Sequence, residues 1–188
     1  MDFDKVIKER HSVRSFKKTK KVDYHKIVEI IEAGNSAPLA GNVYSLKFLL
    51  VQDKEKIKAL SVAAQQDFIE EVDYLLVVCS DKRDLDRNYY ERGAMYARQQ
   101  AGAAIENMLL KITELGLGSC WVGAFSDDTV KRILVIPDNI DVEAILPIGI
   151  ELGKKKQQPK PALERVLAFD EWGNRYMKPR SVVHGSRT

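Results

Sequence analysis

Residues 101–125 read AGAAIENMLLKITELGLGSCWVGAF, and they pass from a helical pattern into a predicted strand. From Glu91 to Leu115 the apolar residues recur at helical spacing, so the sequence predicts one long helix there. The first half of this helix is rich in alanine and glycine, which allows another helix or a partner subunit to approach closely. Gly116 and Gly118 end the helix, and a strand is expected over 119–122.

The elements on either side mix long helices with a few strands and lack regular βαβ repetition. The other predicted helices span 2–10, 24–34, 54–70 and 127–135, with caps at Asp23 and at Asp127 and Asp128. The other predicted strands span 46–51, 74–79 and 142–150. This order predicts an α+β fold in one domain over 1–188, whose last part, from about 165, is a C-terminal extension that packs on another subunit.

The composition excludes several classes of protein. Of the 188 residues 45% are hydrophobic and 30% charged, the net charge is +3, and basic residues are interspersed with acidic ones, which argues against a nucleic-acid-binding face. Cys79 and Cys120 stand far apart without a CxxC or HxxxH pair, so we expect reduced core thiols and no metal site. The lysine runs 17–21 and 154–156 are expected to be solvated. Neither a signal peptide nor a membrane-length apolar run is present, so we expect a cytoplasmic protein.

The residues that could carry chemistry favour a bound organic cofactor. Arg10, Ser12 and Arg14 place two guanidinium groups and a hydroxyl after a predicted helix, a set that suits phosphate oxygens but is also typical of solvated arginines. The glycines of 116–118 do not form a dinucleotide-binding fingerprint, because Trp121 occupies the position of the third glycine and the helix precedes the glycines. No GxSxG serine or metal-ligand cluster favours hydrolysis or metal catalysis. A cofactor would bring the reactive atoms itself.

Four segments together resemble the nitroreductase family, in the family's order and over most of the chain. They are RHSVRSF at 10–16, SAPLAGN at 36–42, the 101–125 passage, and residues 145–166 with ILPIGIELG and PKPALERV. The resemblance implies an α-β-α sandwich with a mainly antiparallel central sheet. It also implies a homodimer with two FMN sites at the subunit interface and a C-terminal arm exchanged between the subunits.

The resemblance further implies which residues bind FMN. Those that hold the phosphate and the ribityl chain are Arg10, His11, Ser12 and Lys160. Arg14 takes the basic position near the pyrimidine side of the flavin, where a fixed cation stabilises the charge of the reduced ring. The loop residues that come from the other subunit are Ala37, Pro38, Leu39 and Asn42. Trp121, Val122 and Gly123 lie at the ring, with the Gly123 N–H facing flavin N5.

Two departures from the family pattern concern the pocket. Many relatives have Gln-Pro-Trp where this chain has Tyr44-Ser45-Leu46, and many have a phosphate-binding arginine where this chain has Ala162. That phosphate contact is therefore either missing or supplied elsewhere, for example by Arg165. A lid has room only at residues 81–92. The candidate substrate-pocket residues are Tyr44, Tyr89, Tyr90 and Phe125, although a core position suits Phe125 equally well.

The resemblance implies an FMN-dependent oxidoreductase with a ping-pong cycle. NADH or NADPH would reduce the flavin and leave, and an organic acceptor such as a nitroaromatic or a quinone would then take two electrons in the same pocket. Three alternatives stay open: a flavin dehydrogenase or dehalogenase specialised for one metabolite, a flavin-binding protein without turnover, and, ranked last, a nucleic-acid-binding module. No motif in the sequence distinguishes NADH from NADPH.

Overall fold

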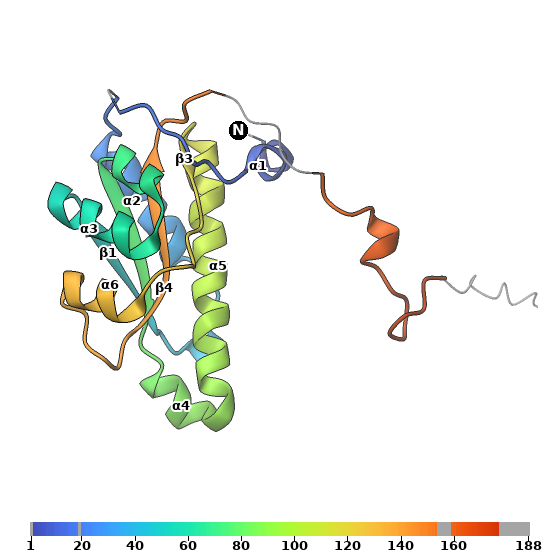
Figure 1. The fold of residues 1–188 in the computed structure, drawn as a ribbon. Helices are drawn as coiled ribbons and strands as arrows, with labels where there is room; N and C mark the ends of the chain where they lie inside the picture. Colours follow the sequence, from blue (N-terminus) through green and yellow to red (C-terminus); the bar gives the residue numbers. More distant parts are fainter. Residues whose placement is uncertain (1, 19, 154–158, 177–188) are drawn as a thin grey trace, which may run out of the picture. The chain divides into compact units, whose positions relative to one another are not determined.

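The computed structural model describes residues 2–18, 20–153 and 159–176 (Figure 1). The chain divides into two compact units, residues 1–155 and residues 156–188. The α-helices of the first unit are α1 Phe3–Glu9, α2 Tyr24–Asn35, α3 Lys54–Ala64, α4 Arg83–Tyr89, α5 Gly93–Glu114 and α6 Asp127–Leu134. Its strands are β1 Leu46–Val51, β2 Tyr74–Ser80, β3 Gly118–Ser119 and β4 Asp141–Gly149. Short 3-10 turns lie at Ala40–Asn42, Asp67–Glu71 and Tyr90–Arg92.

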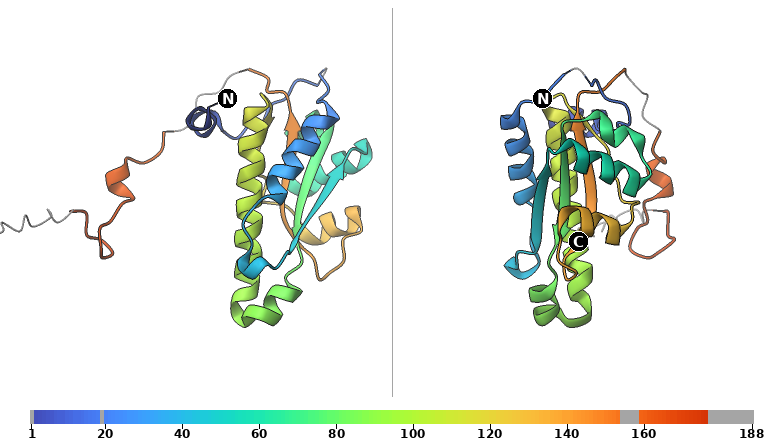
Figure 2. Two further views of the ribbon diagram at one scale, coloured as in Figure 1. Left: turned by 180° about the vertical axis from the view of Figure 1, so that it is seen from behind. Right: turned by 60° about the vertical axis from the view of Figure 1, so that its left-hand side comes forward.

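The strands form one antiparallel sheet in the order β1-β2-β4-β3. Helices α2 and α5 cover one face of this sheet, and α3 and α6 cover the other (Figures 1 and 2). The prediction of an α+β sandwich around an antiparallel sheet is therefore confirmed.

The apolar run of β2 is buried on both sides, which explains its continuous hydrophobicity. Leu75, Val77 and Cys79 pack toward α3 and α6. Leu76 and Val78 pack toward α2 and α5. Two separate cores thus hold the helices to the sheet. Each core stabilises the fold by roughly 25 cal/mol per Å² of apolar surface that it buries.

Helix α2 packs closely on α5, and the closest approach is at a glycine of α2. A Cβ atom at Gly34 of α2 would lie 2.0 Å from Cε of Met108 on α5. Ala101 and Ala104 are buried in the same core. The burial of these two alanines assigns part of the Ala- and Gly-rich half of α5 to packing within the subunit.

Three predicted boundaries are wrong. The helix expected over 54–70 ends at Ala64, because Gln65 is left-handed (φ 53°) and its N–H bonds back to Val62, and a separate 3-10 turn follows. Ser126, rather than Asp127 or Asp128, occupies the N-cap position of α6, and the two aspartates lie in the first turn, where they favour the helix dipole. The strand expected over 119–122 covers only Gly118–Ser119.

Other expectations concern single residues and the chain ends. Cys79 and Cys120 are buried and not disulfide-bonded, as expected. Within the described residues no helix is both long and apolar enough to cross a membrane. Lys18, Lys20 and Lys21 are exposed, whereas the 154–156 lysine run and the end of the predicted arm, 177–188, lie outside the described residues. The second unit contains a 3-10 turn at Leu163–Arg165.

Candidate functional site

The segment after α1 is anchored to the edge of the sheet by two buried side chains. Val13 and Phe16 are 4% and 2% exposed, and the Val13 N–H donates to the Ser119 carbonyl at 2.8 Å. Ser12 forms a parallel bridge with Ser119. Because neighbouring residues of an extended segment face opposite sides, burial of Val13 leaves Ser12 and Arg14 exposed.

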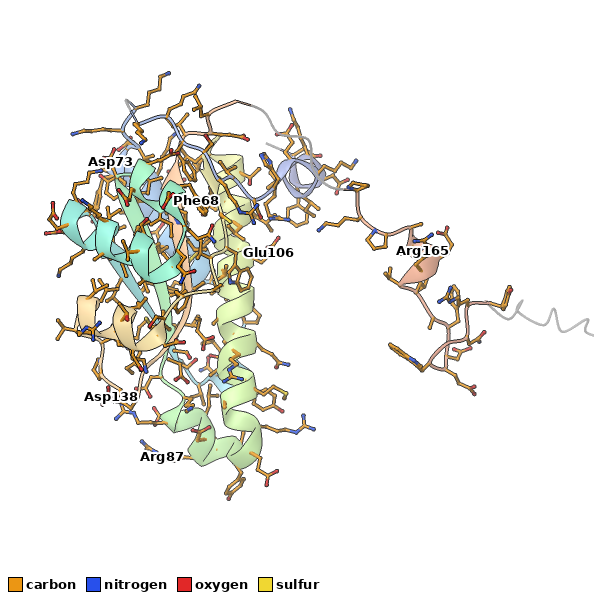
Figure 3. All side chains as sticks on the ribbon, viewed as in Figure 1. Phe68, Asp73, Arg87, Glu106, Asp138 and Arg165 are labelled. Atoms are coloured by element: carbon orange, nitrogen blue, oxygen red, sulfur yellow. The ribbon has the colours of Figure 1, made fainter. Side chains whose placement is uncertain are left out.

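Two cationic side chains at the start of this segment have carboxylate partners. The Arg10 Nε lies 3.4 Å from an oxygen of Glu106, which projects from α5 (Figure 3). The His11 Nε2 lies 2.9 Å from Glu151, and its Nδ1 lies 2.7 Å from the Glu9 carbonyl. These two hydrogen bonds, that to Glu9 first, raise the pKa of His11 above its ordinary value. Arg10 and His11 thus each face a carboxylate beside the edge of the sheet, and the contacts of His11 favour its protonated form.

Strand β3 leaves the sheet opposite a proline, which is why the predicted strand is cut short. Gly118 and Ser119 pair with Gly149 and Ile148, and Val122 pairs again with Ile145 through hydrogen bonds of 3.0 and 3.1 Å. Continuing the register places Cys120 opposite Pro147. Hydrogen-bonded pairs recur at every second residue of an antiparallel ladder, and Pro147 has no N–H to donate to the Cys120 carbonyl.

The backbone beyond this gap presents donors to the outside of the sheet. Because the Val122 N–H points toward β4, the N–H groups of Trp121 and Gly123 point away from it. Neither group makes a hydrogen bond to another part of the described chain. Gly123 is exposed and has no side chain to cover this edge. The edge therefore has room for a ligand that carries hydrogen-bond acceptors.

The surroundings of this edge are an exposed indole, a buried thiol and a cation. The Trp121 side chain is 42% exposed, and its ring lies beside α5, since a Cβ atom at Gly102 would be 3.8 Å from it. Burial raises the pKa of the Cys120 thiol, and the nearby Arg14 and Ser12 partly offset that effect. The fold thus brings together the predicted FMN-binding residues of the 10–14 segment and those at 121–123.

The predicted loop 36–44 lies elsewhere in the chain. It leads into β1, whose first residue, Leu46, pairs with Ser80 and so stands at the Asp141 end of β4. Ser119 pairs with Ile148 at the other end of β4, roughly 20 Å away along the strand. Strands β1 and β3 are also opposite edges of the sheet. One chain therefore does not bring both predicted sets of FMN ligands to one place.

The candidate pocket residues divide between this loop and the core. The Tyr89 hydroxyl lies against Gly41, and the Tyr44 hydroxyl donates to Asn35 at 2.5 Å. Tyr90 is 81% exposed. Phe125 packs against the core under α3 and α6, which favours its structural interpretation.

The remaining predicted residues lie in the second unit or within the loop. Lys160, Ala162 and Arg165 are exposed residues of the second unit. Ala37 is buried, whereas Pro38 and Asn42 are exposed and Leu39 is half-buried. For all of them the role in binding stays a prediction.

Two larger hollows lie away from the 121–123 edge. One of about 320 Å³ is lined by residues of α1, α2 and α5, and one of about 590 Å³ by α6 and the turn after it. Neither is lined by a predicted site residue. At the edge itself lies a cavity of about 30 Å³ lined by Arg10 and His11, where the Ser119 hydroxyl is buried without a partner among the described residues. An open edge of this kind needs a further wall before it encloses a ligand.

Comparison with known proteins identifies the family. The family model described as the nitroreductase family matches residues 7–82 and 60–150. The chain belongs to the nitroreductase family. A putative NADH dehydrogenase/NAD(P)H nitroreductase of Archaeoglobus fulgidus is 30% identical over 156 residues, covering 80% of this chain and 86% of the relative.

Two further relatives of this nitroreductase-family chain are similar over most of their length. An iodotyrosine deiodinase of Thermotoga neapolitana is 26% identical over 181 residues, covering 82% of this chain and 91% of the relative. The solved structure of an FMN-dependent nitroreductase of Clostridium difficile R20291 superposes with a TM-score of 0.77 and 26% identity, covering 89% of this chain and 98% of that one.

The structure also adds residues of this family member that were not predicted from its sequence. Pro147 interrupts β3, and Glu106 and Glu151 pair with Arg10 and His11. A proline inside the apolar run 144–150 could have indicated, from the sequence, the interruption at Pro147. The two glutamates are ordinary surface residues in the sequence, and only the fold brings them to their partners.

Proposed function

We propose that this protein is an FMN-dependent NAD(P)H oxidoreductase that reduces an organic acceptor by two electrons in a ping-pong cycle. The observation that carries the proposal is the pair of outward-facing N–H groups of Trp121 and Gly123, next to the cation of Arg14. A flavin ring carries carbonyl and imine acceptors along its edge and gains negative charge when it is reduced. Relatives named as NAD(P)H nitroreductases and as an FMN-dependent nitroreductase support the proposal.

The residues present suit FMN. Arg10, His11 and Ser12 would hold the phosphate and the ribityl chain, because they bring a guanidinium group, an imidazole and a hydroxyl to the same edge. Arg14 would stabilise charge on the pyrimidine side of the ring. Lys160, with or without Arg165, is proposed as a further phosphate contact. Gly123 allows close approach of the ring, since no side chain stands between it and the backbone N–H.

We propose that the site is completed by a second copy of the chain. The loop with Pro38 and Asn42 stands at the far edge of the sheet from residues 10–14, so a partner subunit is the simplest source of this wall. On α1, Phe3 and Ile7 are 65% and 49% exposed, which favours a protein contact at that surface. The exposed apolar side chains of the second unit suit the exchanged arm; they include Leu163, Val166, Leu167 and Trp172.

When bound, FMN would supply the two-electron chemistry between NAD(P)H and the acceptor. The chain's contribution is binding, orientation and charge. The exposed Trp121 indole would provide an apolar wall for the cofactor, and Arg14 would provide a fixed positive charge. The scheme requires no acid or base side chain, and we nominate none.

The first experiment is an anaerobic titration of the purified protein with NADH and, separately, NADPH, followed by the visible spectrum. A flavin spectrum that bleaches on addition establishes both cofactor and donor, and the faster nucleotide shows the preference. A colourless protein that does not take up added FMN would overturn the proposal. A flavin spectrum that neither nucleotide bleaches would indicate a flavin-binding protein without turnover.

A reductive dehalogenase is the second candidate, favoured by the relative named iodotyrosine deiodinase. The two candidates share the cofactor and differ in the acceptor. Turnover of the reduced protein with a quinone, a nitroaromatic and an iodinated tyrosine distinguishes them. Fast reoxidation by the iodinated compound alone, with release of iodide, would favour the dehalogenase.

A further inference from the structure

The loop that leads into β1 is tied to its surroundings on both sides of the 40–42 turn. Before the turn, the Ala37 N–H donates to the Gly34 carbonyl of α2 at 3.1 Å. After it, the Tyr44 hydroxyl bonds to Asn35, and the buried Ser45 hydroxyl donates to Gln100 on α5 at 2.7 Å. Between these ties, Gly41 and Asn42 are exposed.

That turn has an unusual backbone. Gly41 and Asn42 follow one another with φ values of 55° and 59°, both in the left-handed region. Glycine adopts this conformation easily. It is disfavoured for other residues, although less so for asparagine than for most. A Cβ atom at Gly41 would lie 1.9 Å from the Tyr89 hydroxyl oxygen and 3.1 Å from its ring. The tip of Tyr89 therefore rests directly on the backbone of the turn.

Tyr89 is itself held by α5. Its ring meets the Tyr96 ring edge-on, with centroids 5.0 Å apart and an interplanar angle of 89°, a favoured aromatic geometry. Helix α4 folds tightly back on α5, since a Cβ atom at Gly93 would lie 2.5 Å from the backbone of Asp86. Contacts thus run without a break from α5 through Tyr96 and Tyr89 to Gly41.

We infer that Tyr89 is a positioning residue, which holds the Gly41-Asn42 turn in the shape that presents Asn42 to the cofactor and sets the width of the acceptor pocket. The role of Asn42 at the cofactor rests on the proposed function, whereas the contact between Tyr89 and Gly41 does not. Residues 81–92, the one place where the sequence has room for a lid, would then support the loop. Loss of this support should weaken the binding of FMN and of the acceptor, while the chemistry that the cofactor supplies stays the same.

The first test is hydrogen–deuterium exchange of residues 37–44 in the full-length protein without FMN. Tyr89→Ala is expected to raise the exchange rate of the turn, whose Val43 N–H bonds to the Ala40 carbonyl, by roughly tenfold or more. Tyr89→Phe keeps the contact with Tyr96 and should lie between this variant and the wild type. Tyr24→Ala removes an exposed tyrosine from α2 and is the matched control, with no expected change. Equal exchange in Tyr89→Ala and the wild type would overturn the inference.

The second test separates positioning from a loss of folded protein. With FMN saturating and a quinone as acceptor, Tyr89→Ala should raise the dissociation constant of FMN and the KM for the quinone by roughly tenfold, with kcat within about twofold. A lower kcat with unchanged KM and unchanged FMN affinity would mean fewer active molecules and would overturn the inference. A wild-type protein that binds no FMN overturns the proposed function instead, and the exchange experiment then still decides whether Tyr89 holds the loop.

Discussion

His11 and Arg14, beside the edge of the sheet, differ in how neighbouring groups hold them and affect their charge. His11 has oxygen partners on both ring nitrogens, so its protonated form is favoured and its pKa is raised above 6.5. Arg14 is exposed and is placed by the burial of Val13 rather than by a carboxylate. The contribution of His11 should therefore depend on pH, whereas Arg14 should act through its permanent charge.

For His11 the sign of the pH effect follows from the raised pKa. The stabilisation is complete below about pH 6.5, the ordinary value that also holds in the unfolded chain, and is lost as the pH rises through the raised value. We expect His11→Gln to lower the free energy of unfolding by about 1 kcal/mol at about pH 5.5 and by much less at about pH 8.5. Urea denaturation of the flavin-free protein at both pH values measures this, and an equal loss at both contradicts it.

For Arg14 the proposed function predicts an effect on reduction. Arg14→Ala should leave the oligomer intact and slow anaerobic flavin reduction by roughly tenfold to a hundredfold, because the reduced ring loses a stabilising charge. Arg14→Lys keeps the charge and should retain most of the rate. Stopped-flow absorbance measures both variants. An unchanged rate in Arg14→Ala with full FMN occupancy would refute this role.

At the scale of elements, the end of β3 decides which backbone groups are available. Pro147 stands in a central strand, where proline is tolerated because its missing N–H faces the position at which β3 has left the sheet. The break leaves Cys120 and Trp121 outside the ladder, between the bridge at Ser119 and the pair at Val122. The candidate site is thus built at an interruption in the sheet.

We expect Pro147→Ala to extend β3 across the gap. The new N–H at position 147 should donate to the Cys120 carbonyl and exchange slowly with solvent, which amide exchange by NMR detects. Pro137→Ala, in the turn before β4, is the control, since Pro137 contributes only its carbonyl to Ile140. If the new amide exchanges as fast as an exposed one, Pro147 is not the cause of the interruption.

For the whole molecule, the position of the site residues on the sheet is the main constraint. Residues 10–14 and 120–123 meet at the β3 edge, and the 36–44 loop stands at the β1 edge. The sheet, with the helices that cover it, separates these two edges (Figure 2). A complete cofactor site built from both segments therefore requires two chains.

This requirement predicts that flavin binding depends on protein concentration. Dilution of the loaded protein to the point of subunit dissociation should release FMN, seen as a rise in flavin fluorescence. Asn42→Ala should weaken FMN binding by roughly tenfold and move the release to a higher protein concentration. Sedimentation at the same concentrations gives the oligomeric state. A monomer that retains its FMN would refute the interface site.

The sequence by itself determined the type of most elements and the family. Continuous apolar runs identified β2 and β4, and helical spacing identified α5, because both signals are local properties of the chain. The motifs at 10–16, 36–42 and 101–125 lie within residues 7–150, which the family model matches. Local signals did not show that the helix beginning at Lys54 stops at Ala64, since no glycine or proline marks the left-handed Gln65.

Only the tertiary structure decided how the site is assembled. The pairing of Arg10 with Glu106 joins residues 96 positions apart, and that of His11 with Glu151 joins residues 140 apart. The contact of Tyr89 with Gly41 likewise depends on how α4 folds back on α5. Such contacts arise from the packing of elements against one another, and the sequence around each partner carries no sign of the other. The same holds for Pro147: the sequence contains the proline, but the register between β3 and β4 decides which carbonyl is left without a donor.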